Sequence, residues 1–237
     1  MREKLLLLSN SVNHGKGYLE HAASEINDFL GSEIKEVLFI PYAGVTMSYD
    51  DYTNRVAKPF GSIGYKLRGI HMFDDPVEAV KQASAVAVGG GNTFQLLSCL
   101  YKNNLLDEIR SKARQGMPVL GWSAGSNING PSIRTTNDMP IVEPPSFRAL
   151  NLVPFQINPH YTEATLPNHG GESRKQRIAE FLELNPDIYV VGIPEGALLR
   201  IENGNISTVG PGEIKIFRKG METKIKKVGD DISFLLD

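Results

Sequence analysis

The sequence predicts an α/β fold in which a mostly parallel sheet carries helices on both faces. Strand-like and helix-like segments alternate along the chain, and several strand-like segments are continuously apolar, as in strands buried on both faces. No internal repeat, low-complexity tract or linker interrupts the alternation, so we expect a single α/β domain over residues 1–237. From residue 197 the pattern changes to period-two segments, which predict a C-terminal antiparallel meander.

Short apolar runs predict the strands, and apolar residues at helical spacing predict the helices. Asp75-Pro76 marks one helix start, because proline favours the first turn, and Gly116 marks a helix end. The helix that begins at residue 49 is expected to stop at Pro59. The expected strands lie at 5–11, 36–44, 65–73, 85–88, 118–120, 152–160 and 188–196, and the other helices within 14–31, 75–83, 93–100, 106–116 and 172–185.

The meander is predicted from two turn signals. Asn203-Gly204 is a typical two-residue hairpin turn, because both residues tolerate a positive φ. Residues 213–228 then alternate between apolar and polar side chains around a turn at Gly220. These strands are expected to follow the parallel part of the fold.

The composition argues against several classes of function. The formal net charge is −2, so a nucleic-acid-binding surface or a polybasic membrane patch is not expected. The apolar run in MREKLLLLSN is too short for a signal peptide and reads as a first strand. No apolar run is long enough to span a bilayer. Cys99 is the only cysteine, which excludes an intramolecular disulfide and favours a cytoplasmic protein.

Ser123 is the candidate nucleophile. Ligands of open parallel sheets bind beyond the carboxyl ends of the strands, which points to loops 43–48, 89–93, 121–127, 158–171 and 193–196. The loop 121–127 contains Gly121-Trp122-Ser123-Ala124-Gly125, which fits the G-x-S-x-G pattern of a serine on a strained strand-to-helix turn. The alternative is an ordinary tight turn, because glycine and serine are common residues.

The turn Gly89-Gly90-Gly91 follows an apolar strand and opens a helix. A dinucleotide-binding fingerprint needs a glycine where this chain has Phe94, and no phosphate-binding P-loop pattern occurs, so a nucleotide site is a minor alternative. Consecutive glycines at a strand end can direct backbone N–H groups at an oxyanion. An ordinary tight turn explains them equally well.

A serine nucleophile needs a base and an acid to orient it. His160 ends a predicted strand at the expected site, whereas His21 and His71 lie within predicted elements and His14 and His169 in polar loops. Two carboxylates are candidates for the orienting acid. Glu195 follows another strand end, and Asp138 lies in a polar loop.

Arg174 is the candidate substrate-binding cation. It shares a predicted helix face with the apolar side chains of Ile178, Phe181 and Leu182. Its guanidinium therefore either snorkels to solvent or faces a carboxylate in the cleft.

Metal chemistry is not favoured, because H-E-x-x-H is absent and the segment HYTE offers a single histidine and one acid. We expect no metal and no cofactor.

Together these segments resemble a known family. In order along the chain, GGGNTFQLL, GWSAGSN, IRTTNDMPIV, QINPHYT, GESRKQRI and GIPEG closely resemble peptidase E, the α-aspartyl dipeptidase family of serine peptidases. The resemblance extends from LLLLSNS through GIPEG. It implies a fold related to class I glutamine amidotransferases and hydrolysis of dipeptides with an N-terminal aspartate. A small acidic dipeptide is therefore the expected partner.

The resemblance also implies roles for individual residues. Ser123 matches the nucleophile, His160 the general base and Arg174 the arginine that binds the aspartyl side chain. Both Glu195 and Asp138 match positions proposed for the acid, and the choice stays open. The order serine, histidine, acid argues against the lipase and esterase class that G-x-S-x-G first suggests.

The resulting hypothesis is acyl transfer to water at Ser123. Backbone N–H groups of Gly90, Gly91 and Ala124 are expected to stabilise the oxyanion. Two alternatives stay open besides a nucleotide-binding module. One is a related hydrolase of β-aspartyl amides, similar to cyanophycinase. The other is an amidotransferase-like domain that binds a small acidic ligand without turnover.

Overall fold

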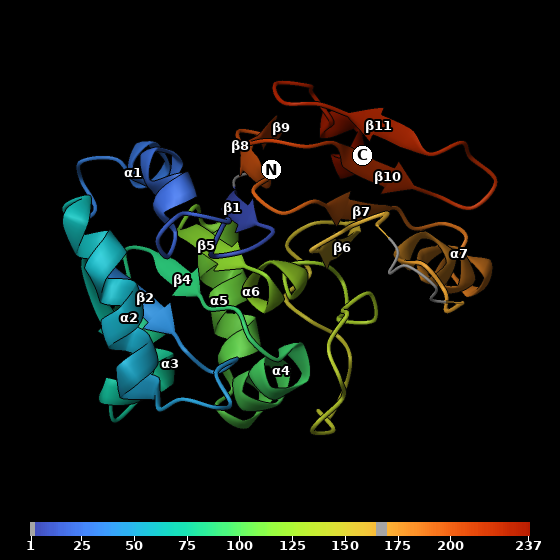
Figure 1. The fold of residues 1–237 in the computed structure, drawn as a ribbon. Coiled ribbons are helices and arrows are strands. Elements are labelled where there is room, and N and C mark those ends of the chain that lie inside the picture. Colours follow the sequence, from blue (N-terminus) through green and yellow to red (C-terminus); the bar gives the residue numbers. More distant parts are fainter. Residues whose placement is uncertain (1–2, 165–169) are drawn as a thin grey trace.

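The computed structural model describes residues 3–164 and 170–237, and its larger sheet has seven strands (Figure 1). Their order is β3-β2-β4-β5-β1-β8-β9. The first five are parallel, and β8 and β9 join antiparallel beside β1. The bounds are β1 Lys4–Leu8, β2 Glu36–Ile40, β3 Lys66–Gly69, β4 Val86–Val88, β5 Pro118–Trp122, β8 Leu198–Glu202 and β9 Asn205–Val209.

A second sheet holds the remaining four strands, in the order β11-β10-β7-β6. Here β6 and β7 are parallel, and β10 and β11 add antiparallel. The sequence analysis placed the strands at 152–160 and 188–196 in one sheet with the others, and the structure corrects this detail. The antiparallel β8 occupies the free edge of β1, so β6 and β7 have no edge to join there. The bounds are β6 Gln156–Pro159, β7 Val190–Ile193, β10 Ile214–Phe217 and β11 Lys224–Lys226.

Helices cover both faces of the larger sheet, as predicted. Alternate leucines of β1 enter different cores, with Leu5 and Leu7 on one side and Leu6 and Leu8 on the other. The first core packs against α3 Pro76–Gln82, α4 Thr93–Lys102 and α5 Leu105–Arg114. The second packs against α1 Ala23–Leu30 and α2 Tyr49–Ser62. Shorter helices are η1 Glu20–Ala22, η2 Ile70–Met72, α6 Ala124–Asn127 and η3 Ser233–Leu236.

The last long helix, α7 Arg174–Leu184, covers the second sheet (Figure 1). Its start is fixed by a capping box, in which Ser173 accepts from the backbone N–H of Gln176 and the Gln176 side chain accepts from that of Ser173. Ile178 and Leu182 are buried against this sheet, as the apolar spacing predicts. This helix end therefore holds Arg174 at a fixed place in its first turn.

Two local predictions met different outcomes. Asn203 and Gly204 have φ of 54° and 78° and connect β8 to β9, which confirms the hairpin turn. The stop at Pro59 is wrong, because α2 continues to Ser62. The buried side chains of Val56 and Phe60 flank the proline and anchor this last turn in the core, which offsets the hydrogen bond that proline cannot donate.

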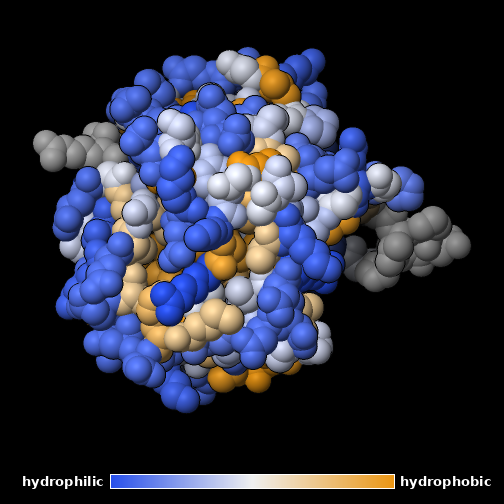
Figure 2. Space-filling view, turned by 90° about the vertical axis from the view of Figure 1, so that its left-hand side faces the viewer, coloured by the Kyte–Doolittle hydropathy of each residue, from blue (hydrophilic) through white to orange (hydrophobic). Residues whose placement is uncertain are grey.

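The face of the molecule in Figure 2 is mainly polar. Figure 2 shows one face covered largely by hydrophilic side chains, with apolar groups exposed in small, separate patches. Within residues 3–164 and 170–237, no helix combines the length and the apolar character needed to cross a bilayer.

Candidate active site

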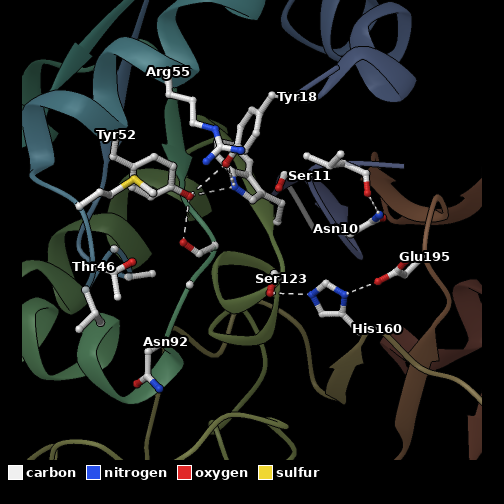
Figure 3. Close-up of a pocket in the computed structure, with 18 of the residues that line it drawn as sticks. Asn10, Ser11, Tyr18, Thr46, Tyr52, Arg55, Asn92, Ser123, His160 and Glu195 are labelled. Carbon is white, nitrogen blue, oxygen red and sulfur yellow. Dashed lines mark hydrogen bonds and ion pairs between the residues drawn. The ribbon is translucent and has the colours of Figure 1, made fainter. Parts of the chain in front are cut away.

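A cleft of about 710 Å³ lies where the carboxyl ends of strands from both sheets meet. Ser123 follows β5, His160 follows β6 and Glu195 follows β7, and all three side chains line this cleft (Figure 3). The sequence analysis expected the site at the carboxyl ends of parallel strands, and the cleft lies there. The two-sheet arrangement brings the histidine and the serine together from different sheets.

Ser123 sits on a strained turn between β5 and α6. Its φ of 53° and ψ of −116° are sparsely populated for a non-glycine residue, and such strain is characteristic of functional sites. The turn needs glycine at position 125, because a Cβ atom there would lie 2.1 Å from the carbonyl oxygen of Val88. The buried Ser126 hydroxyl contacts the carbonyl oxygens of Leu8, at 2.6 Å, and Gly121, at 2.8 Å, which ties α6 to two strands.

The imidazole of His160 connects the serine to a carboxylate. Its Nε2 atom lies 2.9 Å from Oγ of Ser123, and its Nδ1 atom lies 3.1 Å from Oε1 of Glu195 (Figure 3). A carboxylate only accepts hydrogen bonds, so this pairing requires the proton on Nδ1 and leaves Nε2 to accept from the serine hydroxyl. The arrangement is the geometry of a serine, histidine and acid triad.

Two residues that the sequence analysis left unassigned hold this triad in place. The buried Ser9 hydroxyl accepts from the backbone N–H of His160 and donates to the carbonyl oxygen of Ile193, both at 2.8 Å. The Asn10 side chain accepts from the N–H of Gly196 at 2.7 Å, beside Glu195. Both follow β1, so the polar residues directly after the leucine run were the available signal.

The structure brings Asp138 to a different partner. Its Oδ2 atom accepts hydrogen bonds from the backbone N–H of Thr93, at 2.8 Å, and from the Thr93 hydroxyl, at 2.5 Å. The Thr136 hydroxyl also contacts the same oxygen, at 3.1 Å. Thr93 is the first residue of α4, so the carboxylate binds the positive end of this helix. Glu195, and not Asp138, contacts His160.

The predicted oxyanion donors are available beside Ser123. A Cβ atom on Gly90 would lie 3.0 Å from Cβ of Ser123, which places the glycine turn directly against the serine. Within the described part of the chain, the backbone N–H groups of Gly90, Gly91 and Ala124 donate to no acceptor. Unpaired N–H groups at such a position are able to bind developing negative charge.

A cluster of aromatic side chains supports the glycine turn from behind. The Trp122 indole N–H donates to the hydroxyls of Tyr18, at 2.9 Å, and Tyr52, at 3.2 Å. The Tyr52 hydroxyl donates to the carbonyl oxygen of Gly90 at 2.9 Å (Figure 3). Burial raises the pKa of the Tyr52 hydroxyl, which keeps it protonated and able to donate. The sequence analysis did not identify this cluster.

Arg174 lies outside this cleft. Together with Asp138 it lines a neighbouring cavity of about 150 Å³, and it forms no salt bridge with any described residue. Burial lowers the pKa of its guanidinium, the charge of Arg177 lowers it further, and the charge of Asp138 raises it. The guanidinium is therefore partly desolvated, and Asp138 is a nearby charge that forms no direct salt bridge with it. The arginine that lines the cleft itself is Arg55, which the sequence analysis did not single out.

Among the described residues, no other histidine hydrogen-bonds to Ser123 or Glu195. Burial lowers the pKa of His21, and the Nε2 atom of His71 lies 3.0 Å from the Asp50 carboxylate. His14 is exposed, and His169 falls outside the described residues. Among residues 3–164 and 170–237, no group of three or more histidine, cysteine, aspartate or glutamate side chains is arranged to hold a metal ion.

Comparison with known proteins identifies the family. The model of peptidase family S51 matches residues 5–209. The chain belongs to peptidase family S51. It is 54% identical over its whole length to peptidase E of a Nostoc species, covering 98% of that protein, and 47% identical over 98% of its length to peptidase E of Streptomyces coelicolor, covering 95% of that protein.

The solved structures agree on the fold of this S51 peptidase. The crystal structure of a peptidase from an acI-B1 actinobacterium is similar over 99% of this chain and 98% of that chain, with a TM-score of 0.72 and 20% identity. The resemblance drawn from the sequence motifs is confirmed, and the chain is a serine peptidase.

Proposed function

We propose that this S51 peptidase hydrolyses dipeptides with an N-terminal aspartate, through an acyl-enzyme on Ser123. The observation that carries the proposal is the unbroken chain of contacts from Ser123 through His160 to Glu195 at the wall of an open cleft. The peptidase E relatives and the motif resemblance support an Asp-Xaa substrate. The expected ligand is thus a small acidic dipeptide.

The geometry supports the following reaction. His160 accepts the hydroxyl proton of Ser123 at Nε2 while Oγ attacks the peptide carbonyl carbon. Glu195 holds the imidazole in the required tautomer and stabilises the imidazolium that forms. The imidazolium then gives its proton to the leaving amine as the C–N bond breaks. Water repeats the sequence on the acyl-enzyme and regenerates the serine.

The oxyanion of each tetrahedral intermediate is bound by backbone N–H groups in this account. The donors are those of Gly90, Gly91 and Ala124, which have no acceptor among the described residues. They are fixed before the reaction by the Tyr52 hydrogen bond and by the start of α6. Each preorganised donor typically contributes about 3 kcal/mol to transition-state stabilisation.

Arg174 is proposed to bind the aspartyl side chain. Its guanidinium is half-buried and forms no direct salt bridge among the described residues, so a substrate carboxylate can supply a direct ion-pair partner. A neutral first residue leaves this partly desolvated cation without a partner, which disfavours Ala-Xaa and Asn-Xaa substrates. Asp138, which shares the small cavity, is proposed to orient Arg174 and to cap α4, and to have no part in proton transfer.

A dipeptide panel tests this function. The protein is expected to cleave Asp-Leu at least about 100-fold faster, by kcat/KM, than Asn-Leu, Ala-Leu or β-Asp-Arg. In Arg174→Met the preference for Asp-Leu over Ala-Leu should fall to within about tenfold. Lys175→Met is the matched control, because it removes an exposed charge from the same helical turn. Preference for β-Asp-Arg would instead assign a cyanophycinase-like activity, and binding without turnover would assign a non-catalytic domain.

We also propose a cytoplasmic location for the enzyme. The single cysteine, Cys99, excludes a disulfide within the chain, in keeping with a reducing compartment. Recovery of Asp-Leu hydrolysis in the cytoplasmic fraction of its own cells supports this location, and recovery in the secreted fraction opposes it.

A further inference from the structure

The catalytic cleft contains a cation that the proposed mechanism does not use. Arg55 is the one lysine or arginine among the described residues that line it. We propose that Arg55 binds the C-terminal carboxylate of the dipeptide and so restricts this peptidase to substrates with one residue after the scissile bond. This inference rests on the proposed function, because it assigns the second end of the same substrate.

Arg55 is held at the cleft by the aromatic side chain of Tyr18. Its guanidinium carbon lies 4.7 Å from the centre of the Tyr18 ring, in a cation–π contact. The Tyr18 hydroxyl accepts from the indole N–H of Trp122, the residue that precedes Ser123 (Figure 3). Stacking on Tyr18 leaves the N–H groups at the edge of the guanidinium free to donate, which is how arginine binds a carboxylate in a bidentate manner.

The guanidinium of Arg55 has no carboxylate partner among the described residues. Asp51 lies four residues earlier on α2, at the spacing that commonly gives a helical ion pair. Its carboxylate instead accepts from the Ser48 hydroxyl at 2.6 Å, and Arg55 forms no salt bridge with any described residue. Glu195, the one acid among the described residues lining the cleft, pairs with His160. Arg55 therefore offers an uncompensated positive charge to a ligand in the cleft.

The proposed substrate carries two carboxylates, one for each arginine. An Asp-Xaa dipeptide carries one carboxylate on each side of the scissile peptide bond, on the aspartyl side chain and at the C-terminus. Arg174 belongs to α7 and Arg55 to α2, and these helices lie on opposite sides of β5 and α6, which carry Ser123 (Figure 1). A cation on each side of the nucleophile suits both carboxylates at once.

The other residues that line the cleft suit the part of the dipeptide between its scissile bond and its C-terminal carboxylate. Apolar side chains are exposed in the same cleft, and they provide a surface for the side chain of the second residue. A longer peptide carries its carboxylate one residue farther from the scissile bond, and an amidated dipeptide carries none. Neither can therefore pair with Arg55 in the productive position. The exposed apolar side chains that line the cleft are Val12, Val45, Met47 and Ile141.

Comparing a free with an amidated dipeptide tests this assignment. The wild-type protein should cleave Asp-Leu about 10- to 100-fold faster, by kcat/KM, than Asp-Leu amide, mainly through KM. In Arg55→Met, turnover of Asp-Leu should fall by about the same factor, while turnover of the amide stays within about twofold. Arg55→Lys should recover part of the preference. Arg68→Met is the matched control, because Arg68 is also exposed and stacked on a ring, that of Phe73, outside the cleft.

The outcomes separate this inference from the proposed function. Suppose that wild type cleaves Asp-Leu, but Arg55→Met slows the hydrolysis of Asp-Leu and of its amide equally, or slows neither. The assignment of Arg55 is then wrong, and the proposed function stands. If wild type fails to cleave Asp-Leu, the function is wrong and the assignment falls with it. A wild-type protein that cleaves the amide and Asp-Leu equally well also overturns the role of Arg55.

Discussion

His160 and Ser123 approach within hydrogen-bonding distance although they follow strands of two different sheets. His160 follows β6 in the four-stranded sheet and Ser123 follows β5 in the seven-stranded sheet, yet their Nε2 and Oγ atoms are 2.9 Å apart. The contact therefore depends on how the sheets are joined. The buried Ser9 hydroxyl contributes to that junction, because Ser9 follows β1 of the seven-stranded sheet and contacts the backbone of His160 and Ile193 in the four-stranded sheet.

Removing this junction should weaken both stability and catalysis. Ser9→Ala leaves the N–H of His160 without its acceptor, so the free energy of unfolding should fall by about 1–3 kcal/mol. We expect kcat for Asp-Leu to fall about tenfold with little change in KM, because the histidine is no longer fixed. Denaturant unfolding and steady-state kinetics measure both. Ser62→Ala, which removes an exposed hydroxyl bonded to Pro59, should change neither. Wild-type kcat in Ser9→Ala would refute the positioning role.

Glu195 and Asp138 should differ sharply in kinetics. Glu195→Gln removes the charge that orients His160, and kcat should fall by about 10²- to 10⁴-fold. Asp138→Asn should lower kcat by less than about tenfold, and it should cost about 1 kcal/mol of stability, because Asp138 caps α4. The reverse order of kcat losses would assign the orienting role to Asp138.

Tyr52 should affect catalysis through the glycine turn 89–91, which carries two of the predicted oxyanion donors. Tyr52→Phe keeps the ring that packs edge-on against Phe39 but removes the hydrogen bond to Gly90. We expect kcat to fall about tenfold with KM within about twofold, because the bond acts only through the donor turn. Tyr65→Phe is the matched control, since its hydroxyl bonds Asn27 and Gly31 away from the cleft. Equal kcat losses in both variants would show a general effect of stability.

The free energy of unfolding should fall on mild acidification, because His21 then takes up a proton. Burial lowers the pKa of His21 below its usual 6.5, and its Nδ1 atom is buried without a partner among the described residues. The unfolded chain thus binds this proton more readily than the folded one. The stability that neutral His21 contributes is present above pH 6.5 and is lost as the pH falls through the folded pKa. His21→Gln should show a weaker loss than wild type between pH 7.5 and 5, and the exposed His14→Gln should not. Parallel curves for His21→Gln and wild type would contradict this.

Much of the site could be predicted because its chemistry lies at strand ends. Ser123, His160 and Glu195 each follow an apolar run that folds as a strand, so the sequence pattern alone places them at one edge. The choice between Glu195 and Asp138 could not be made that way. A strand end and a polar loop can each supply an orienting acid, and the hydrogen bonds that Thr93 donates to Asp138 depend on tertiary contacts.

The division into two sheets also depends on distant pairing. It follows from β8 pairing antiparallel with β1, a contact between residues 4–8 and 198–202 that no local pattern encodes. Arg55 was missed for a related reason. On the sequence it is one charged residue of an amphipathic helix. It becomes a candidate ligand group only when Tyr18, which is hydrogen-bonded to Trp122, packs beside it.

Hydrolysis of Asp-Leu by Ser123→Ala tests the central claim most directly. The substitution removes one oxygen from a half-buried side chain, so the melting temperature should stay close to that of wild type. The account predicts that the folded variant loses at least about 10³-fold in kcat. A folded Ser123→Ala protein that cleaves Asp-Leu at the wild-type rate would contradict it.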